Sequence, residues 1–420
     1  MAGRPRREGG DDPMTVTADL TTDRLVRTVE RLWPDRAVQL VRGRRRTPGA
    51  QDLIFVPSRS APRLLVPAGR RAAASSGLRR FSRALSGKER AVRLIGSAAL
   101  RVGGEGLLAD RIRIGPPAGG DSIERHLSGI LGTDVVVGLG VGTLRANQKP
   151  ILQVFDRRGR CVAYVKVGDS DLTTGLVRQE GANLAELARH DWSLLEIPAL
   201  LHLGSWNDVE LLVISALDTA ARPGPGVLLQ PPLAPLDELY DRYDEGSAAL
   251  ATTAYWRELR GTADRIEDAG RRASYEEALE RIERSRGDDV VRLTAWHGDF
   301  APWNLGHRGG RLQLWDWERF ATGVPVGLDR VHYVVHTSTR AAGFSDQVLD
   351  TALTSSYVSH PRCSPDEQDL LGGLYLVSLA ARYLIGSQGA QGEVLGPTTR
   401  TVLDALSRHS RRITATKGAR

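Results

Sequence analysis

Lysine and cysteine are both scarce in this chain of 420 residues. Its 57 basic side chains include only four lysines, so a lysine inside an apolar segment needs a specific reason. The two cysteines, Cys161 and Cys363, lack the number and the spacing of a disulfide framework or a zinc site. These absences exclude small disulfide-stabilised folds and cysteine metal sites, and they suit a reducing compartment.

Long hydrophobic runs are also missing. The longest apolar segment, Leu370–Gly386, contains Arg382 and a pair of glycines, so it predicts a buried core helix rather than a membrane span. The first residues lack the apolar core of a secretory signal. With 41% hydrophobic and 25% charged residues, the composition is that of an ordinary globular protein. We therefore expect a cytoplasmic protein without a membrane partner.

Acidic side chains are few in the first 120 residues, which hold 24 basic residues against 11 acidic ones. Residues 121–420 hold 33 basic against 39 acidic residues, so the net charge of +7 comes from the amino-terminal part. Its densest basic cluster is Arg42–Arg46. Because arginine clusters attract phosphate backbones, an Arg-rich nucleic-acid-associated protein is one alternative. It is the less favoured one, since aromatic residues for base stacking are sparse there.

Carboxylates, an amide and an imidazole are concentrated between Trp296 and Glu318, in the sequence WHGDFAPWNLGHRGGRLQLWDWE. His297, Asp299 and Asn304 fall on a loop, and Asp316 follows an apolar run that predicts a strand. The glycines between them suit a tight turn. The stretch therefore predicts a hairpin that gathers these polar groups, although turn formation and capping alone would use the same residue types.

These residue types suit phosphoryl transfer. That reaction needs an acceptor for the proton of the attacking hydroxyl and oxygen ligands for Mg²⁺ on the nucleotide phosphates. Asp299 can accept the proton, and Asn304 and Asp316 carry the hard oxygen donors that Mg²⁺ prefers. The spacing of His297, Asp299 and Asn304 matches the catalytic loop of protein kinases, with Gly298 in place of arginine.

HGDFAPWN followed by WDWE resembles the aminoglycoside phosphotransferase / choline kinase group of kinase-like enzymes. The resemblance extends over residues 121–420 and implies a two-lobe, protein-kinase-like α+β fold that uses ATP or GTP with Mg²⁺. It implies Asp299 as the base, supported by His297, and Asn304 and Asp316 as metal ligands. Glu318 is a weaker candidate near the metal, and Asp329 is expected to have a structural role.

Three glycines and one lysine are the candidates for nucleotide binding in the strand-rich part. Gly138, Gly140 and Gly142 fall between two apolar strands, where either a phosphate-binding loop or a plain hairpin turn fits. Lys166 lies in the apolar strand 160–168, so we expect it to contact nucleotide phosphates. By the resemblance, its carboxylate partner on the following helix is Glu180.

Glu186 is the alternative partner of Lys166 on that helix.

Further along, an acidic run over residues 237–245 either holds an amine-containing acceptor or forms a solvated helix face. The sequence leaves open which of these two roles the acidic run has.

We expect four consecutive parts. They are a disordered tail (1–17), a basic N-terminal α/β subdomain (18–120), a kinase-like small lobe (121–216) and a mostly helical large lobe (217–420). The first of these contains Met14, and the sequence leaves open whether Met14 is the true start. In the basic subdomain, the pattern predicts a helix over 18–32, strands over 52–57, 63–67 and 110–114, and a long helical stretch over 70–101.

Together these features predict a Mg²⁺-assisted, ATP- or GTP-dependent phosphotransferase that moves the γ-phosphoryl group to a hydroxyl of a small molecule. The alternatives are a non-catalytic nucleotide-binding module of the same fold and the nucleic-acid-associated protein named above. The sequence leaves open the acceptor and the oligomeric state.

Overall fold

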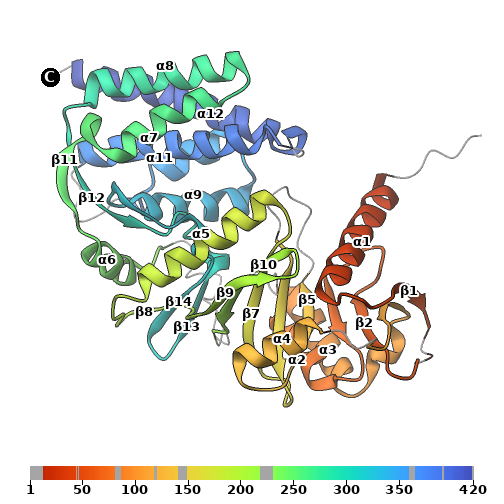
Figure 1. Ribbon diagram of the computed structural model, residues 1–420. Helices are drawn as coiled ribbons and strands as arrows, with labels where there is room; N and C mark the ends of the chain where they lie inside the picture. Colours follow the sequence, from red (N-terminus) through yellow and green to blue (C-terminus); the bar gives the residue numbers. More distant parts are fainter. Residues whose placement is uncertain are drawn as a thin grey trace, which may run out of the picture. The chain divides into compact units, whose positions relative to one another are not determined.

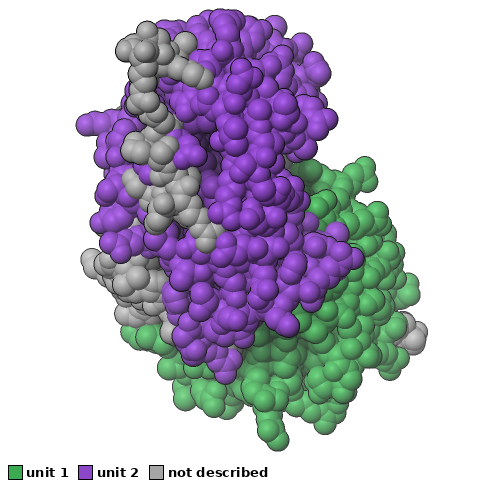
Figure 2. Space-filling view, turned by 90° about the vertical axis from the view of Figure 1, so that its left-hand side faces the viewer, with its two compact units in different colours: residues 1–181, 199–216 green, residues 182–198, 217–420 purple. Residues whose placement is uncertain are grey.

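The computed structural model describes residues 13–418 except 44, 46, 81–86, 118–120, 141–148, 218–229, 359–364 and 390–391. The chain forms two compact units, which Figure 2 colours separately. Unit 1 comprises Met1–Gly181 and Ala199–Ala216, and unit 2 comprises Ala182–Pro198 and Leu217–Arg420. The predicted α+β class, with a strand-rich part before a mostly helical part, is confirmed.

Unit 1 is built on one nine-stranded antiparallel sheet with the order β1-β4-β2-β3-β5-β6-β7-β10-β9 (Figure 1). Residues 38–114 contribute four of its strands, and the pairing of Leu65 with Leu139 joins β3 to β5. The strands are β1 (Val38–Arg42), β2 (Gln51–Val56), β3 (Leu64–Pro67), β4 (Asp110–Ile114), β5 (Val135–Gly140), β6 (Ile151–Asp156), β7 (Cys161–Gly168), β9 (Leu200–Trp206) and β10 (Val209–Ser215).

Strand β2 shows why this sheet is continuous. Its apolar run is buried on both faces, as expected for a central strand. Leu53 and Phe55 pack in a core cluster that also contains Val137 from β5, whereas Ile54 and Val56 pack in a second cluster with residues of α2 and α3. The basic amino-terminal part therefore shares its hydrophobic core with the strands that follow it.

The helices of unit 1 refine the boundaries predicted from sequence. Helix α1 (Pro13–Leu32) begins with proline at its first position, inside the tail predicted over 1–17, because proline favours that position. Residues 1–12 lie outside the described part. The predicted stretch 70–101 contains α2 (Arg71–Arg80) and α3 (Gly87–Arg101). Helix α4 (Ile123–Leu131) is capped by the Ser122 hydroxyl, and α5 (Asp171–Leu187) begins in unit 1 and ends in unit 2.

Unit 2 combines helices with two small sheets (Figure 1). One sheet has the order β11-β12-β15 and the other β13-β14-β8. The helices are α6 (Leu233–Arg242), α7 (Ala254–Thr262), α8 (Ala269–Arg286), α9 (Leu328–Ala342), α10 (Asp346–Leu353), α11 (Pro365–Gly386) and α12 (Gly392–Gly418). The strands are β8 (Leu195–Glu196), β11 (Gly246–Ala249), β12 (Val290–Trp296), β13 (Leu305–Arg308), β14 (Arg311–Leu314) and β15 (Ala321–Pro325).

Helix α11 contains the apolar segment singled out in the sequence. By length and composition, its residues Glu367–Gly386 form the one candidate membrane span among the described residues, with a mean hydropathy of 1.2. However, 67% of the 18-residue apolar window within this segment is buried. Leu374, Leu376 and Val377 belong to the main hydrophobic cluster of the unit. The expectation of a core helix is therefore confirmed.

Deleting residues 1–117 should prevent unit 1 from folding, because β5 would lose its partner β3 and the shared core would lose Leu53 and Phe55. We expect the truncated protein to be insoluble or, if it is soluble, to lack the cooperative thermal transition of unit 1. Deleting residues 1–12 removes none of these core residues and is the control. A soluble truncated protein that melts like the full chain would show that the two parts are independent.

Candidate active site

The predicted hairpin is present and lies directly after strand β12. Strands β13 and β14 pair antiparallel, and Gly309 and Gly310 form their turn with φ values of 56° and 82°. The carbonyl of Asn304 accepts the N–H of Trp315 at 3.2 Å. This bond joins the start of the hairpin to its end, immediately before Asp316.

The Asp299 carboxylate is held through both of its oxygens. Asn304 Nδ2 donates to Asp299 Oδ2 at 2.9 Å and to the Asp299 carbonyl at 2.9 Å. On the other side, His332 Nε2 lies 3.1 Å from Asp299 Oδ1. The Asp299 side chain is 28% exposed, so the carboxylate is fixed but reachable from solvent.

His297 is buried, and both of its ring nitrogens bond to the backbone of the loop and hairpin. Its Nδ1 accepts the N–H of Asp299 at 3.1 Å, so the ring proton lies on Nε2, which donates to the Trp315 carbonyl at 3.0 Å. Its ring packs edge-on against Trp317, with centroids 4.5 Å apart. His297 therefore connects the loop to the end of the hairpin and supports the geometry of Asp299.

Asp329, in the first turn of α9, holds the backbone of the same loop. Its carboxylate accepts the N–H of His297 at 2.6 Å and that of Gly298 at 3.0 Å. Gly298 has φ of 77°, and a Cβ there would lie 2.5 Å from the Arg319 carbonyl, so only glycine fits. Burial raises the pKa of Asp329 to about 7, against the opposing effect of the two N–H donors.

A buried guanidinium from α11 completes this region. Arg382 Nη2 donates to the Gly298 carbonyl at 2.8 Å, and its guanidinium carbon lies 5.9 Å from the centre of the Trp296 ring. Burial lowers the pKa of Arg382 to about 10, and the nearby Asp299 carboxylate acts in the opposite direction. A helix distant in sequence thus brings a positive charge to the carbonyl of Gly298.

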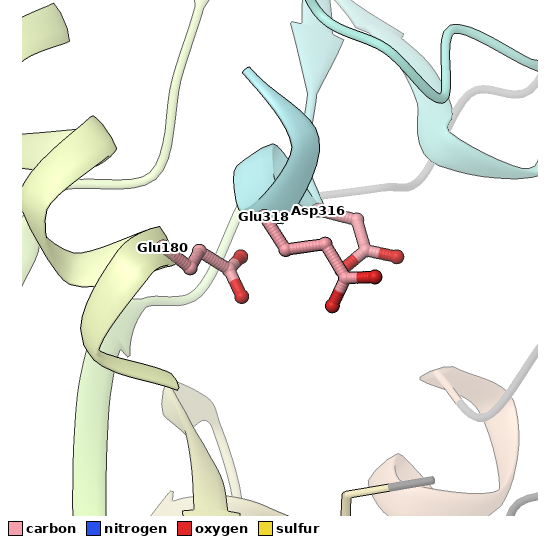
Figure 3. A group of neighbouring side chains, drawn as sticks. All are labelled: Glu180, Asp316 and Glu318. Carbon is pink, nitrogen blue, oxygen red and sulfur yellow. The ribbon is translucent and has the colours of Figure 1, made fainter. Parts of the chain in front are cut away.

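Asp316 and Glu318 follow the hairpin in a tight turn, and Figure 3 shows both carboxylates extending to the same side of it. Asp316 has φ of 72°, a left-handed conformation that is uncommon for residues other than glycine. Such backbone strain is concentrated at functional sites. Asn183 Nδ2 donates to the Trp317 carbonyl at 2.8 Å and fixes the turn. Carboxylate oxygens in a fixed turn are suitable ligands for a hard cation.

In unit 1, Lys166 on β7 and Glu180 on α5 form the predicted pair (Figure 3 shows Glu180). Lys166 Nζ lies 2.6 Å from both carboxylate oxygens, and both residues are buried. Lys149 Nζ lies 3.9 Å from Glu180 Oε2 and is also buried. The alternative Glu186 instead pairs with Arg189 at 2.9 Å.

Two of the three candidate glycines, Gly138 and Gly140, lie in strand β5 rather than in a loop between strands. Gly138 lies within β5, opposite Gln153, and a Cβ there would approach the Leu65 carbonyl of β3 at 3.0 Å. Gly140 is the last residue of β5. Gly142 lies outside the described residues. The close packing of β3 against β5 therefore accounts for Gly138.

Sequence reasoning missed several residues of this site. His332 and His336 are one helical turn apart on α9, and this spacing was the available signal because the chain has only nine histidines. In unit 1, Lys149 beside Glu180 was also missed, although it carried a similar signal as one of four lysines. Tyr375 and Arg382 are separated from the hairpin by long stretches of sequence and gave no local signal.

The acidic run at α6 has structural contacts. Glu238 accepts the N–H groups of Leu194 at 2.8 Å and of Leu195 at 3.0 Å, and so holds β8 in place. Asp244 pairs with Arg292 at 2.6 Å. These contacts account for the presence of two carboxylates of the acidic run without a role in binding an acceptor substrate.

Neither a protein-family model nor a curated protein sequence matches this chain. Similar solved structures include a thermostable variant of aminoglycoside phosphotransferase APH(4)-Ia with AMP-PNP and hygromycin B (16% identity, TM-score 0.48, 69% of this chain and 99% of that one). Others are choline kinase LicA from Streptococcus pneumoniae (15%, 0.44, 68% and 98%) and a gentamicin complex of APH(2")-IIa (14%, 0.45, 70% and 99%). All three bear names from the aminoglycoside phosphotransferase / choline kinase group.

Replacing Asp329 by asparagine should remove part of the pH dependence of stability. With a pKa of about 7 in the folded chain, Asp329 keeps a proton that the unfolded chain releases near pH 4. Its contribution to stability is therefore complete below about pH 4 and is lost as the pH rises through 7, by up to about 4 kcal/mol. The free energy of unfolding, measured with urea between pH 4.5 and 7.5, should depend less steeply on pH in Asp329→Asn than in the wild type. The same dependence on pH in both proteins would contradict the raised pKa of Asp329.

Proposed function

We propose that this protein is a Mg²⁺-assisted phosphotransferase that moves the γ-phosphoryl group of ATP or GTP to a hydroxyl of a small molecule. The observation that carries this proposal is the Asp299 carboxylate, which is partly exposed and fixed by Asn304 and His332. A fixed, reachable carboxylate at the end of a rigid loop is what a general base for a substrate hydroxyl requires.

Asp299 would act as the base. An ionised carboxylate has about four lone-pair directions. Asn304 and His332 each occupy one, on different oxygens, so further directions are left for an incoming hydroxyl. The two donors fix the plane of the carboxylate and therefore determine the direction from which the hydroxyl is deprotonated.

The donor set beside Asp299 fits Mg²⁺. Asn304 Nδ2 is directed at two oxygens of Asp299, which identifies it as the nitrogen and turns the amide oxygen Oδ1 away from that carboxylate. Asn304 Oδ1 and the Asp316 carboxylate would hold the cation, with Glu318 as an additional candidate. Bound Mg²⁺ would neutralise charge on the nucleotide phosphates during transfer.

Lys166 would bind the nucleotide phosphates, and Glu180 would orient it. A buried ion pair contributes little net stability compared with apolar side chains of the same size. Its presence on β7 and α5 is therefore better explained by a requirement for a fixed ammonium group. A compact ammonium with three donors can bond to Glu180 and to a phosphate at the same time.

The isosteric variant Asp299→Asn tests the base. We expect transfer from ATP or GTP in Mg²⁺ to fall between about 10²- and 10⁴-fold, because the amide cannot take up the proton. The assay measures ADP or GDP release against a panel of amino sugars, amino alcohols and neutral sugars. Nucleotide affinity, measured by calorimetry, should be unchanged. Transfer at the wild-type rate would eliminate Asp299 as the base, and nucleotide binding without transfer in the wild type would indicate a non-catalytic module.

Glu180→Gln tests the nucleotide site. The neutral amide keeps the shape of the side chain but no longer fixes the Lys166 ammonium by charge, so the KM for the nucleotide should rise about tenfold or more. Glu186→Gln is the matched control, because Glu186 lies on the same helix and pairs with Arg189. Equal kinetic parameters for Glu180→Gln and Glu186→Gln would contradict the proposed role.

A further inference from the structure

We propose that His332 is a positioning residue for Asp299, which it holds by donating Nε2–H to Oδ1 while the Tyr375 hydroxyl fixes the opposite ring nitrogen. This inference rests on the proposed function, since it concerns the orientation of the proposed base. It assigns a role in the reaction to a side chain that no sequence motif indicated.

The hydrogen-bond partners determine the tautomer of His332. Its Nε2 lies 3.1 Å from Asp299 Oδ1, and its Nδ1 lies 3.3 Å from the Tyr375 hydroxyl. An ionised carboxylate can only accept, so the ring proton must be on Nε2. Nδ1 is then an acceptor and accepts a hydrogen bond from the Tyr375 hydroxyl. The donations therefore run in one direction, from Tyr375 through His332 to Asp299.

Burial keeps each member of this chain in the required state. His332 is fully buried, and burial together with the Arg382 charge lowers its pKa well below the usual value, so the imidazole is neutral. Burial also raises the pKa of Tyr375, so the phenol retains its proton. A neutral ring between a phenol and a carboxylate has one arrangement of protons that satisfies all three groups.

Packing also prevents the ring from rotating. The His336 ring lies one turn further along α9, with its centroid 4.0 Å from that of His332 and the planes tilted by 34°. The Tyr375 ring approaches from α11, with centroids 5.9 Å apart. His336 in turn contacts Trp303, which lies on the loop next to Asn304. The imidazole is therefore enclosed by side chains from two helices.

Helix α9 thus holds the loop through two separate contacts. Asp329, in the first turn of α9, binds the backbone at His297 and Gly298, and His332, three residues later, binds the side chain of Asp299. Rotation of an aspartate about its last torsion is otherwise loosely restricted. With Asn304 alone, the carboxylate could turn away from the substrate hydroxyl. Misplacement of a reacting group by about 1 Å can cost about 100-fold in rate.

Four variants test this role: His332→Leu, His332→Gln, Asp299→Asn and the double variant that combines His332→Leu with Asp299→Asn. His332→Leu should lower kcat about 10- to 100-fold and leave both KM values within about twofold. Glutamine carries an N–H where His332 carries Nε2–H, so His332→Gln should recover most of the loss. In the Asp299→Asn background, His332→Leu should have no further effect, because His332 acts through Asp299.

Equal losses for the His332→Leu and His332→Gln variants, or the same loss in both backgrounds, would overturn the proposal. Tyr375→Phe keeps the ring packing and removes only the hydroxyl, so it should lower kcat a few-fold even if His332→Leu does not fold. In the wild type, ¹⁵N NMR between pH 6 and 8 should show His332 protonated on Nε2 alone; an Nδ1–H signal would refute the assignment. Because the tautomer is observed without turnover, failure to find any acceptor would count against the proposed function and not against this contact.

Discussion

Two backbone N–H groups, those of His297 and Gly298, depend on one buried carboxylate for their hydrogen bonds. Asp329 accepts both, and Gly298 has a left-handed conformation that only glycine can adopt at this position. An unsatisfied N–H in this interior would cost about 1–3 kcal/mol. The carboxylate therefore fixes the loop, and the loop fixes Asp299, Asn304 and the start of the hairpin.

The position of Asp329 also explains why α9 matters for the site. A helix whose first turn contacts the loop can present further side chains to that loop at intervals of three or four residues. His332 reaches Asp299 in this way, and His336 packs behind it. Arg382 adds a positive charge from α11 at the Gly298 carbonyl. The site is thus assembled from one local hairpin and two helices that are distant in sequence.

The hairpin and Lys166 could be predicted because their signals are local: fixed spacing in one case, and a rare residue type in an apolar strand in the other. Glu180 was favoured over Glu186 only by the family resemblance. His332 and Arg382 lie 33 and 84 residues from the loop atoms that they contact, and only tertiary packing defines those contacts. The contact of Arg382 with the loop was also hard to predict for a second reason. In the sequence this arginine interrupts an apolar run, and it was therefore used only as evidence against a membrane span. The shared sheet of unit 1 was similarly hidden, because nothing local specifies that β3 pairs with β5.

The proposed function requires the Asp299 loop to direct a substrate hydroxyl to the γ-phosphoryl group. The most direct measurement is ³¹P NMR of the full-length protein with Mg²⁺, ATP or GTP and each candidate acceptor. We expect a phosphomonoester resonance that grows in step with the nucleoside diphosphate for at least one acceptor. Nucleoside diphosphate accompanied only by inorganic phosphate, or unchanged nucleotide with every acceptor, would contradict the proposed function.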